Sequence, residues 1–181
     1  MTIIAIDPGI NGGIAWKSNS GKVNAVRMPQ TIQEISEVLI AARHNISPDF
    51  VGDNPNTMIV GTCSIDDQVV CYLEEVHAMP GQGVTSMWTF GEHYGMLKGL
   101  LYGLQIPLIP VRPKDWQKAI GATRPSPPKD ATRAQKARIQ HEGKVKIKSI
   151  VQARYPHLKV TFMTADALGI IYYTEKIGKS I

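Results

Sequence analysis

Hydrophobic residues at the start of the chain fall in three short runs, at residues 2–6, 12–17 and 22–28. Turn-forming residues separate these runs, with Asn11 and Gly12 in the first gap and residues 19–21 in the second. Short apolar runs bounded by Gly and Asn are typical of β-strands. The pattern therefore predicts a meander of three strands.

After residue 30 the spacing of the hydrophobic residues changes from that of a strand to that of a helix. Thr31 is followed three residues later by Glu34, as in a capping box, and apolar residues recur at positions 32, 35, 38, 39 and 42. This spacing predicts a helix over residues 31–45. A segment rich in Asn, Asp, Pro and Gly at 47–57 predicts a loop, and the apolar run at 57–62 is a possible strand without a defined place.

Strands and helices alternate through the rest of the chain. We expect strands at 68–76, which ends in two acids, and at 106–111, and helices at 86–105, 113–121, 133–155 and 164–178. Within them, Pro113 opens its helix, Gly143 is expected to interrupt the third, and Thr164 is the expected N-cap of the last.

A glycine stands at every fourth position of the predicted helix 86–105, at residues 91, 95, 99 and 103. Each glycine inside a helix costs about 1 kcal/mol relative to alanine, so the repeat needs a compensating reason. A smooth strip allows close approach of another backbone. Packing on the protein's own sheet and contact with a second copy of the chain are equally good explanations.

The composition is that of a globular protein, with 181 residues, 43% hydrophobic and 19% charged. The length predicts one domain over residues 1–181. The chain has no apolar stretch of membrane-spanning length and no export signal. We therefore expect a cytoplasmic protein without a membrane partner.

Positive charge is concentrated in one part of the chain. Thirteen Lys and Arg residues stand between Arg112 and Lys159 against three acids, although the net charge of the whole chain is only +5. An acidic body with one basic segment is typical of a protein that binds a phosphate backbone and has a separate carboxylate site. A solvated lysine-rich helix is the plainer alternative.

Three acids stand at the ends of predicted elements. Asp7 follows the first strand and precedes Pro8-Gly9, Glu74 closes a buried strand, and Asp166 lies in the first turn of the last helix. A buried carboxylate is costly unless it meets a cation. Each acid also has an ordinary explanation: a turn for Asp7, an ion pair for Glu74, and a favourable helix dipole for Asp166.

The order of these elements and several motifs resemble the RNase H-like nucleases, and within them the RuvC family of Holliday junction resolvases, especially versions carried by bacteriophages and prophages. The matching stretches span the chain: "IIAIDPGINGGIA", "YLEEVHAMPGQGVTSMWTFGEHYG", "VRPKDWQKAIG", "KVKIKSIVQARYP" and "TADAL". The resemblance implies an α/β fold with a central mixed five-stranded sheet flanked by helices. It also implies nicking of four-way DNA junctions by a homodimer that depends on Mg²⁺, with Mn²⁺ as a substitute.

The same resemblance implies roles for individual residues. Asp7, Glu74 and Asp166 correspond to ligands of two metal ions, with Glu75 as the alternative to Glu74, and Lys118 and Lys146 correspond to lysines near the scissile phosphate. Lys144 and Lys148 are alternatives to Lys146. The expected DNA-contacting residues are His77, Gln82, Gly83, Trp88, Phe90, Arg112, Lys114, Lys144 and Lys148, although Trp88 and Phe90 fit a core role equally well.

One departure from the family pattern affects the expected activity. The family usually has a further Asp or His three or four residues before the last aspartate, where this chain has Phe162 and Met163. His157 is a possible substitute ligand. A branched-DNA-binding protein that does not cut is therefore the main alternative, and an actin-like kinase fragment is a weaker one. The sequence does not define a helicase partner.

Overall fold

The computed structural model describes residues 1–44, 68–77, 83–123, 125–128 and 130–178. Its strands are β1 (Thr2–Asp7), β2 (Gly13–Lys17), β3 (Val23–Arg27), β4 (Val69–Glu74) and β5 (Leu108–Val111). Its helices are α1 (Ile32–Arg43), α2 (Val84–Gly103), α3 (Pro113–Ala119), α4 (Arg133–Arg154) and α5 (Ala165–Ile177). The loop and possible strand predicted within residues 47–62 lie outside the described residues.

The five strands form one mixed sheet in the order β3-β2-β1-β4-β5. The meander of β1, β2 and β3 is antiparallel, whereas β4 pairs parallel to both β1 and β5. The parallel pairing brings the carboxyl ends of β1 and β4 to the same edge of the sheet. The predicted mixed sheet flanked by helices is confirmed.

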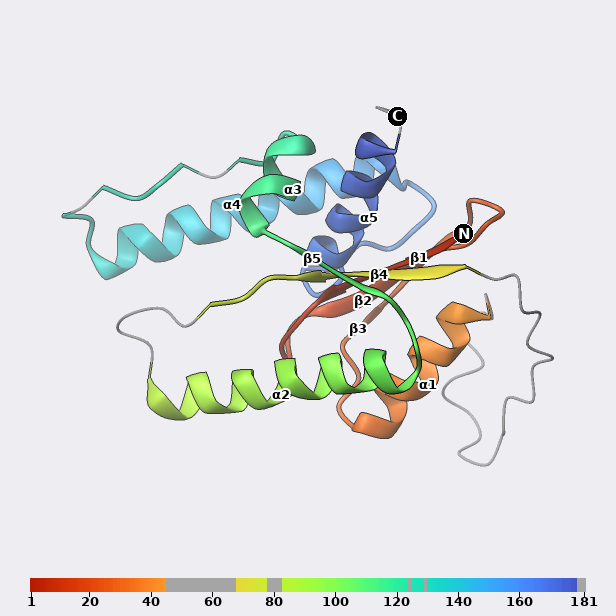
Figure 1. Cartoon of the computed structure of the whole chain (residues 1–181). Helices are drawn as coiled ribbons and strands as arrows, with labels where there is room; N and C mark the ends of the chain where they lie inside the picture. The colour runs from red at the N-terminus through yellow and green to blue at the C-terminus, as the bar shows by residue number, and fades with distance from the viewer. Residues whose placement is uncertain (45–67, 78–82, 124, 129, 179–181) are drawn as a thin grey trace.

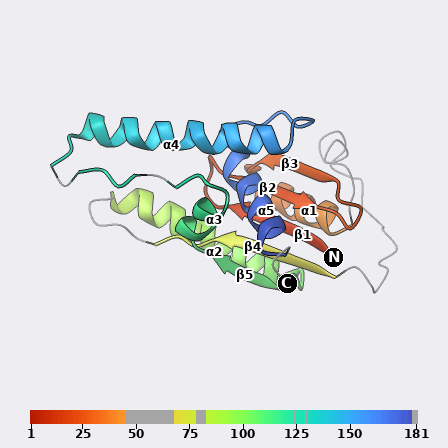
Figure 2. The same ribbon diagram turned by 90° about the horizontal axis from the view of Figure 1, so that it is seen from above.

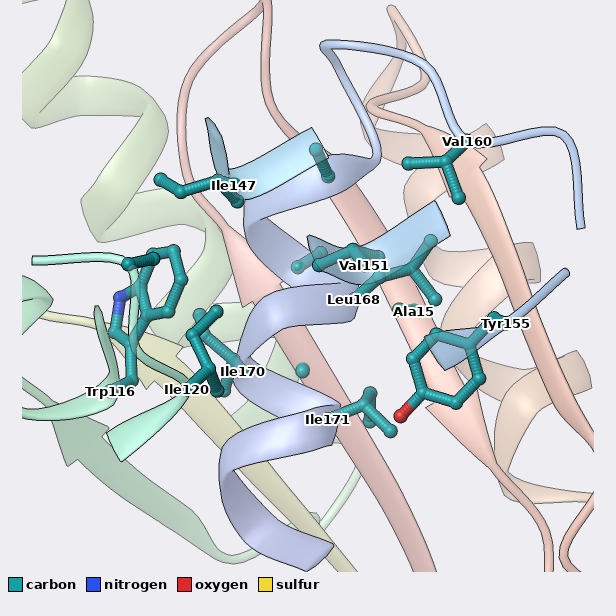
Figure 3. Packing of buried hydrophobic residues seen from close by; sticks show 14 of the residues in the cluster. Ala15, Trp116, Ile120, Ile147, Val151, Tyr155, Val160, Leu168, Ile170 and Ile171 are labelled. Carbon is teal, nitrogen blue, oxygen red and sulfur yellow. The ribbon is translucent and has the colours of Figure 1, made fainter. Parts of the chain in front are cut away.

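Helices cover both faces of the sheet (Figure 1), with α1 and α2 on one side and α3, α4 and α5 on the other. Alternate strand residues supply the two cores, since successive side chains of a strand point to opposite faces. Ile4, Ile6 and Leu73 pack toward α1 and α2. Ala5 and Ala15 pack toward α5, where Figure 3 shows Trp116 beside the aliphatic side chains of α4 and α5.

The long helices α2 and α4 extend past the carboxyl ends of β1 and β4 (Figures 1 and 2). The buried residues of α2 are Leu97 and Leu101, and those of α4 are Gly143, Ile147 and Val151. All of them lie in the middle or the second half of their helix. The first halves of both helices therefore project beside the sheet edge instead of contributing to the core.

One sequence-based expectation about the helices was wrong, and another is confirmed in position although its side chain bonds differently. Helix α4 runs without a break through Gly143, which is buried, so packing of this face outweighs the low helix propensity of glycine. Thr164 is the N-cap of α5, but its side chain does not cap the helix. Its hydroxyl instead hydrogen-bonds within the preceding turn, to Thr161.

The glycines at 91, 95, 99 and 103 lie on the outer side of α2. All four are exposed, and a Cβ atom added at any of them would meet nothing within 4 Å in the described part of the chain. The strip therefore does not pack on the protein's own sheet. Among the described helices, none is both long enough and apolar enough to cross a membrane.

Candidate active site

The first candidate ligand, Asp7, is the last residue of β1 and pairs with Gly13 at the start of β2. The chain reverses between them through Gly9, whose φ of 107° lies in a region that favours glycine. A Cβ atom at Gly12 would collide with the carbonyl oxygen of Asp7. The "DPGINGG" sequence thus forms a tight turn and also holds the Asp7 carboxyl group at the sheet edge.

Strand alternation decides which acids face each other. Residues two apart in a strand lie on the same face of the sheet. Asp7 therefore shares a face with Ala5, and Glu74 shares a face with Tyr72; this is the face that α5 covers. Glu75 points to the opposite face, where its charge acts on Tyr94 and on Arg112. The register therefore favours Glu74 over Glu75 as the partner of Asp7.

The surroundings of Asp7 raise the pKa of its carboxyl group well above the ordinary value. Burial is the largest cause, followed by the negative charges of Glu74 and Asp166, while Lys144 acts in the opposite direction. A hydrogen bond between the Asp7 and Glu74 side chains raises the pKa further. The fold thus gathers the three predicted acids in a partly dehydrated place, where their mutual repulsion favours a bound proton or cation.

Glu74 is buried at 9% exposure and accepts a hydrogen bond from the indole nitrogen of Trp116 at 2.8 Å. Trp116 lies in α3 and belongs to the core under α5. A Cβ atom at Gly169 of α5 would lie 2.6 Å from the Trp116 ring, so this glycine leaves room for the indole. The ring thereby fixes one oxygen of a candidate ligand.

The acids suit a hard divalent cation, because carboxylate oxygens are the preferred ligands of Mg²⁺ and Mn²⁺. Among the described residues, no three acid, His or Cys side chains already adopt a metal-binding geometry. The fit rests instead on the donor set, since the negative charges of Glu74 and Asp166 both act on Asp7 at the end of β1. A divalent cation would relieve the repulsion that raises the pKa of Asp7.

The lysines of α4 lie on different sides of the helix. Lys144 is the lysine whose positive charge lowers the pKa of Asp7. Lys146 is about 200° further around the helix, since each residue turns it by about 100°. The structure therefore favours Lys144 over Lys146 near the acids. Lys118 is exposed at the end of α3.

The expected DNA-contacting residues that the structure describes lie on several elements: after β4, on the first half of α2, at the start of α3 and on α4. Gly83 is the N-cap of α2, Trp88 is 75% exposed on that helix, and His77 is exposed just after β4. Trp88 is therefore not a core residue. Three further expected residues, Arg112, Lys114 and Lys144, are exposed, and Arg112 pairs with Asp115 at 2.8 Å. Lys148 is partly buried, and Gln82 lies outside the described residues.

Phe90 and His93 attach α2 to the loop that follows Asp7. The N–H of Gly9 donates a hydrogen bond to Nδ1 of His93 at 3.3 Å, and the Phe90 ring packs against Gly9. Phe90 also lies between two hollows of about 360 and 410 Å³, one of them shared with His77. No local sequence pattern indicates this role of His93, because its partner is 84 residues away.

Phe162 and Met163, at the positions where the resemblance implies a further ligand, lie close to this edge. Phe162 and Met163 are 44% and 38% exposed in the turn before α5. The carbonyl of Met163 lies over Gly13, the strand partner of Asp7. His157, the possible substitute ligand, lies edge-on to Tyr155 with ring centroids 6.4 Å apart. Tyr155 is in turn close to Glu175, which pairs with Lys17 at the end of β2 opposite to Gly13.

The sheet order and the flanking helices define an RNase H-like fold. Neither a family model nor a curated protein matches the sequence. Solved structures do match: one is Thermus thermophilus RuvC in complex with a Holliday junction substrate, with a TM-score of 0.54 and 12% identity over 99% of this chain and 96% of that one. Another Thermus thermophilus RuvC structure matches with a TM-score of 0.51 and 14% identity, over 99% and 96% of the two chains. The chain therefore has a RuvC-like fold.

Proposed function

We propose that this chain is a metal-dependent endonuclease that nicks branched DNA, with the four-way junction as its substrate, and that residues 1–181 form a single nuclease domain. The observation that carries the proposal is the electrostatic coupling of Asp7 with Glu74 and Asp166 at one sheet edge. It is supported by the fold shared with RuvC, one structure of which contains a Holliday junction.

In this proposal Asp7, Glu74 and Asp166 hold two Mg²⁺ ions, for which Mn²⁺ can substitute. When bound, such ions supply an activated water and neutralise the charge that develops on a phosphodiester. Trp116 orients Glu74 through its 2.8 Å hydrogen bond. In this proposal Lys144, whose charge acts on Asp7, offsets negative charge of the substrate, and Lys118 and Lys146 are further candidates for this role.

Helix α4 supplies the proposed DNA-binding surface. The whole helix carries seven Lys and Arg residues against one acid, Glu142. Such a row of cations attracts a phosphate backbone whatever its sequence. We also propose that the enzyme is a cytoplasmic homodimer, because symmetric nicking of a four-way junction requires two active sites, and the exposed glycine strip of α2 is the proposed contact.

A second candidate function is branched-DNA binding without cleavage. The specific observation in its favour is that the apolar residues Phe162 and Met163 replace the family's usual further ligand. Three carboxylates can suffice where waters complete the coordination, so we place nicking first.

One assay separates the two functions. Labelled four-way junction, replication fork and linear duplex are incubated with the protein in Mg²⁺, in Mn²⁺ or in chelator. The proposal predicts nicks in the junction with either metal and none in chelator. Binding to the junction without nicks in either metal would support the second function. Absence of both binding and nicking would contradict both functions.

A further inference from the structure

An apolar surface of two adjacent residues borders the acid cluster. Phe162 and Met163 precede α5 and keep 44% and 38% of their surface exposed. The Met163 carbonyl lies against Gly13, where an added Cβ would be 2.5 Å from it. Since Gly13 pairs with Asp7, the turn that carries these side chains is joined to the strand end that carries the acid.

The turn is internally hydrogen-bonded. The N–H of Thr161 donates to the hydroxyl of Thr164 at 3.1 Å, and the N–H of Thr164 donates to the hydroxyl of Thr161 at 3.2 Å. Thr164 is itself buried at 6% exposure. Phe162 and Met163 are therefore held on a closed, anchored turn, and their exposure is not the result of a loose segment.

Cationic and aromatic groups of α4 surround the Phe162 ring. The ammonium of Lys148 lies 4.8 Å from the ring centroid, in a cation–π contact, and the ring of His141 lies 6.0 Å away at 46°. Lys144, one turn before Lys148, is the residue whose charge acts on Asp7. The ring thus lies beside the lysine-bearing face of α4, on a turn whose backbone contacts the strand partner of Asp7.

We infer that Phe162 is a stacking platform for an unpaired nucleobase of the DNA strand that enters the acid cluster, with Lys148 holding an adjacent phosphate. This inference rests on the proposed function, because it requires a DNA strand at the acids. Chemical complementarity identifies the occupant. A nucleotide has an aromatic base that can stack on the exposed Phe162 ring and a phosphate that can bind the lysines beside it. Unpaired bases occur where a branched DNA opens, so the platform favours branched over continuous duplex.

The test measures binding in chelator, so that cleavage does not enter the readout. The probes are a four-way junction with unpaired bases and a continuous duplex of the same sequence, both carrying 2-aminopurine. Phe162→Ala should weaken junction binding about 5- to 140-fold, since stacking on an aromatic side chain contributes about 1 to 3 kcal/mol per base. Duplex binding should stay unchanged. The quenching of 2-aminopurine that wild-type protein causes should be lost.

Matched variants isolate the ring. Phe162→Tyr should bind the junction like wild type, whereas Phe162→Leu, which keeps apolar bulk without the ring, should resemble Phe162→Ala. Ile32→Ala removes another exposed apolar side chain, 59% exposed at the start of α1, and should have no effect. Thermal unfolding of each variant checks that the fold is retained.

Different results overturn different statements. If wild-type protein does not prefer the junction to the duplex, the proposed function fails and this inference with it. If wild type prefers the junction but Phe162→Ala or Phe162→Leu binds equally well, the inference alone is wrong. It is also wrong if Phe162→Ala changes the sedimentation of the free protein, because the side chain then contacts another protein copy.

Discussion

The indole nitrogen of Trp116 lies 2.8 Å from Oε1 of Glu74, so a core residue of α3 orients an acid at the end of β4. Trp116→Phe removes this donor and leaves the fold's aromatic packing largely in place. We expect nicking to fall about 10- to 100-fold, with a higher Mg²⁺ concentration needed for half of the maximal rate, as for other residues that orient metal ligands.

A second buried tryptophan provides the control for this variant. Trp16 is fully buried on the other face of the sheet, and its indole nitrogen has no hydrogen-bond partner among the described residues. Trp16→Phe should cost stability without changing the Mg²⁺ dependence of nicking. If both variants lose activity in proportion to the fall in their melting temperatures, Trp116 acts only through packing.

Neutral replacements of the three acids test the proposed metal site. Asp7→Asn, Glu74→Gln and Asp166→Asn keep nearly the same shape but remove charges that a hard cation needs. Each should abolish nicking in Mg²⁺, while junction affinity measured in chelator is retained or improved, because repulsion of phosphate is relieved. A folded Asp7→Asn protein that nicks at the parent rate would mean that Asp7 is only a turn residue.

The basic helix α4 predicts salt-dependent binding. Alanine at Lys144, Lys146 and Lys148 together should lower the slope of log affinity against log salt by up to about 3, if each lysine neutralises one phosphate. Because Lys144 faces the acids and Lys146 does not, Lys144→Ala alone should reduce the nicking rate more than Lys146→Ala does. An unchanged slope in the triple variant would remove α4 from the DNA interface.

The glycine strip makes a prediction about assembly. A side chain at Gly99 meets nothing within 4 Å in the described part of the chain, so Gly99→Leu should not destabilise a monomer, and leucine has the higher helix propensity. If the strip contacts a second copy, the same change should prevent close approach. We expect a dimer for wild type and a monomer for the variant in sedimentation. A variant that remains dimeric would place the contact elsewhere.

An ion-pair cluster at the other end of the sheet predicts a pH dependence of stability. Burial raises the pKa of Glu175, but hydrogen bonds and charge from Lys17 and Arg154 outweigh it, so the pKa is lowered overall. The two contacts measure 3.0 and 2.6 Å. A lowered folded-state pKa means that the stabilisation is present above the unfolded value, about 4.3, and is lost as the pH falls through the folded value.

Glu175→Gln should therefore be less stable than wild type at pH 7, by about 1 to 2 kcal/mol, since Lys17 and Arg154 are partly exposed and solvent screens their charges. The difference should shrink as the pH falls below about 4. Urea unfolding at pH 7 and at pH 3 measures it. A difference that is the same at both pH values would show that charge on Glu175 does not contribute.

The type and order of most elements could be predicted from the sequence, because apolar periodicity and capping residues act within a few neighbours along the chain. The runs at 2–6 and 12–17 predicted β1 and β2, and the Thr31 capping box predicted α1. The same reasoning failed at Gly143, since intrinsic propensity does not include the tertiary packing that keeps α4 continuous.

The candidate acids were also found from the sequence, because Asp7, Glu74 and Asp166 stand at element ends where local rules make a carboxyl group unusual or favourable. Their meeting at one edge depends on the parallel pairing of β1 with β4, which no local pattern contains. Only the tertiary structure, through the strand register, makes Glu74 and not Glu75 the neighbour of Asp7 and brings the charge of Lys144 to act on it. Trp116 and His93 reach their partners across 42 and 84 residues, and contacts at such separations arise from how helices pack on the sheet.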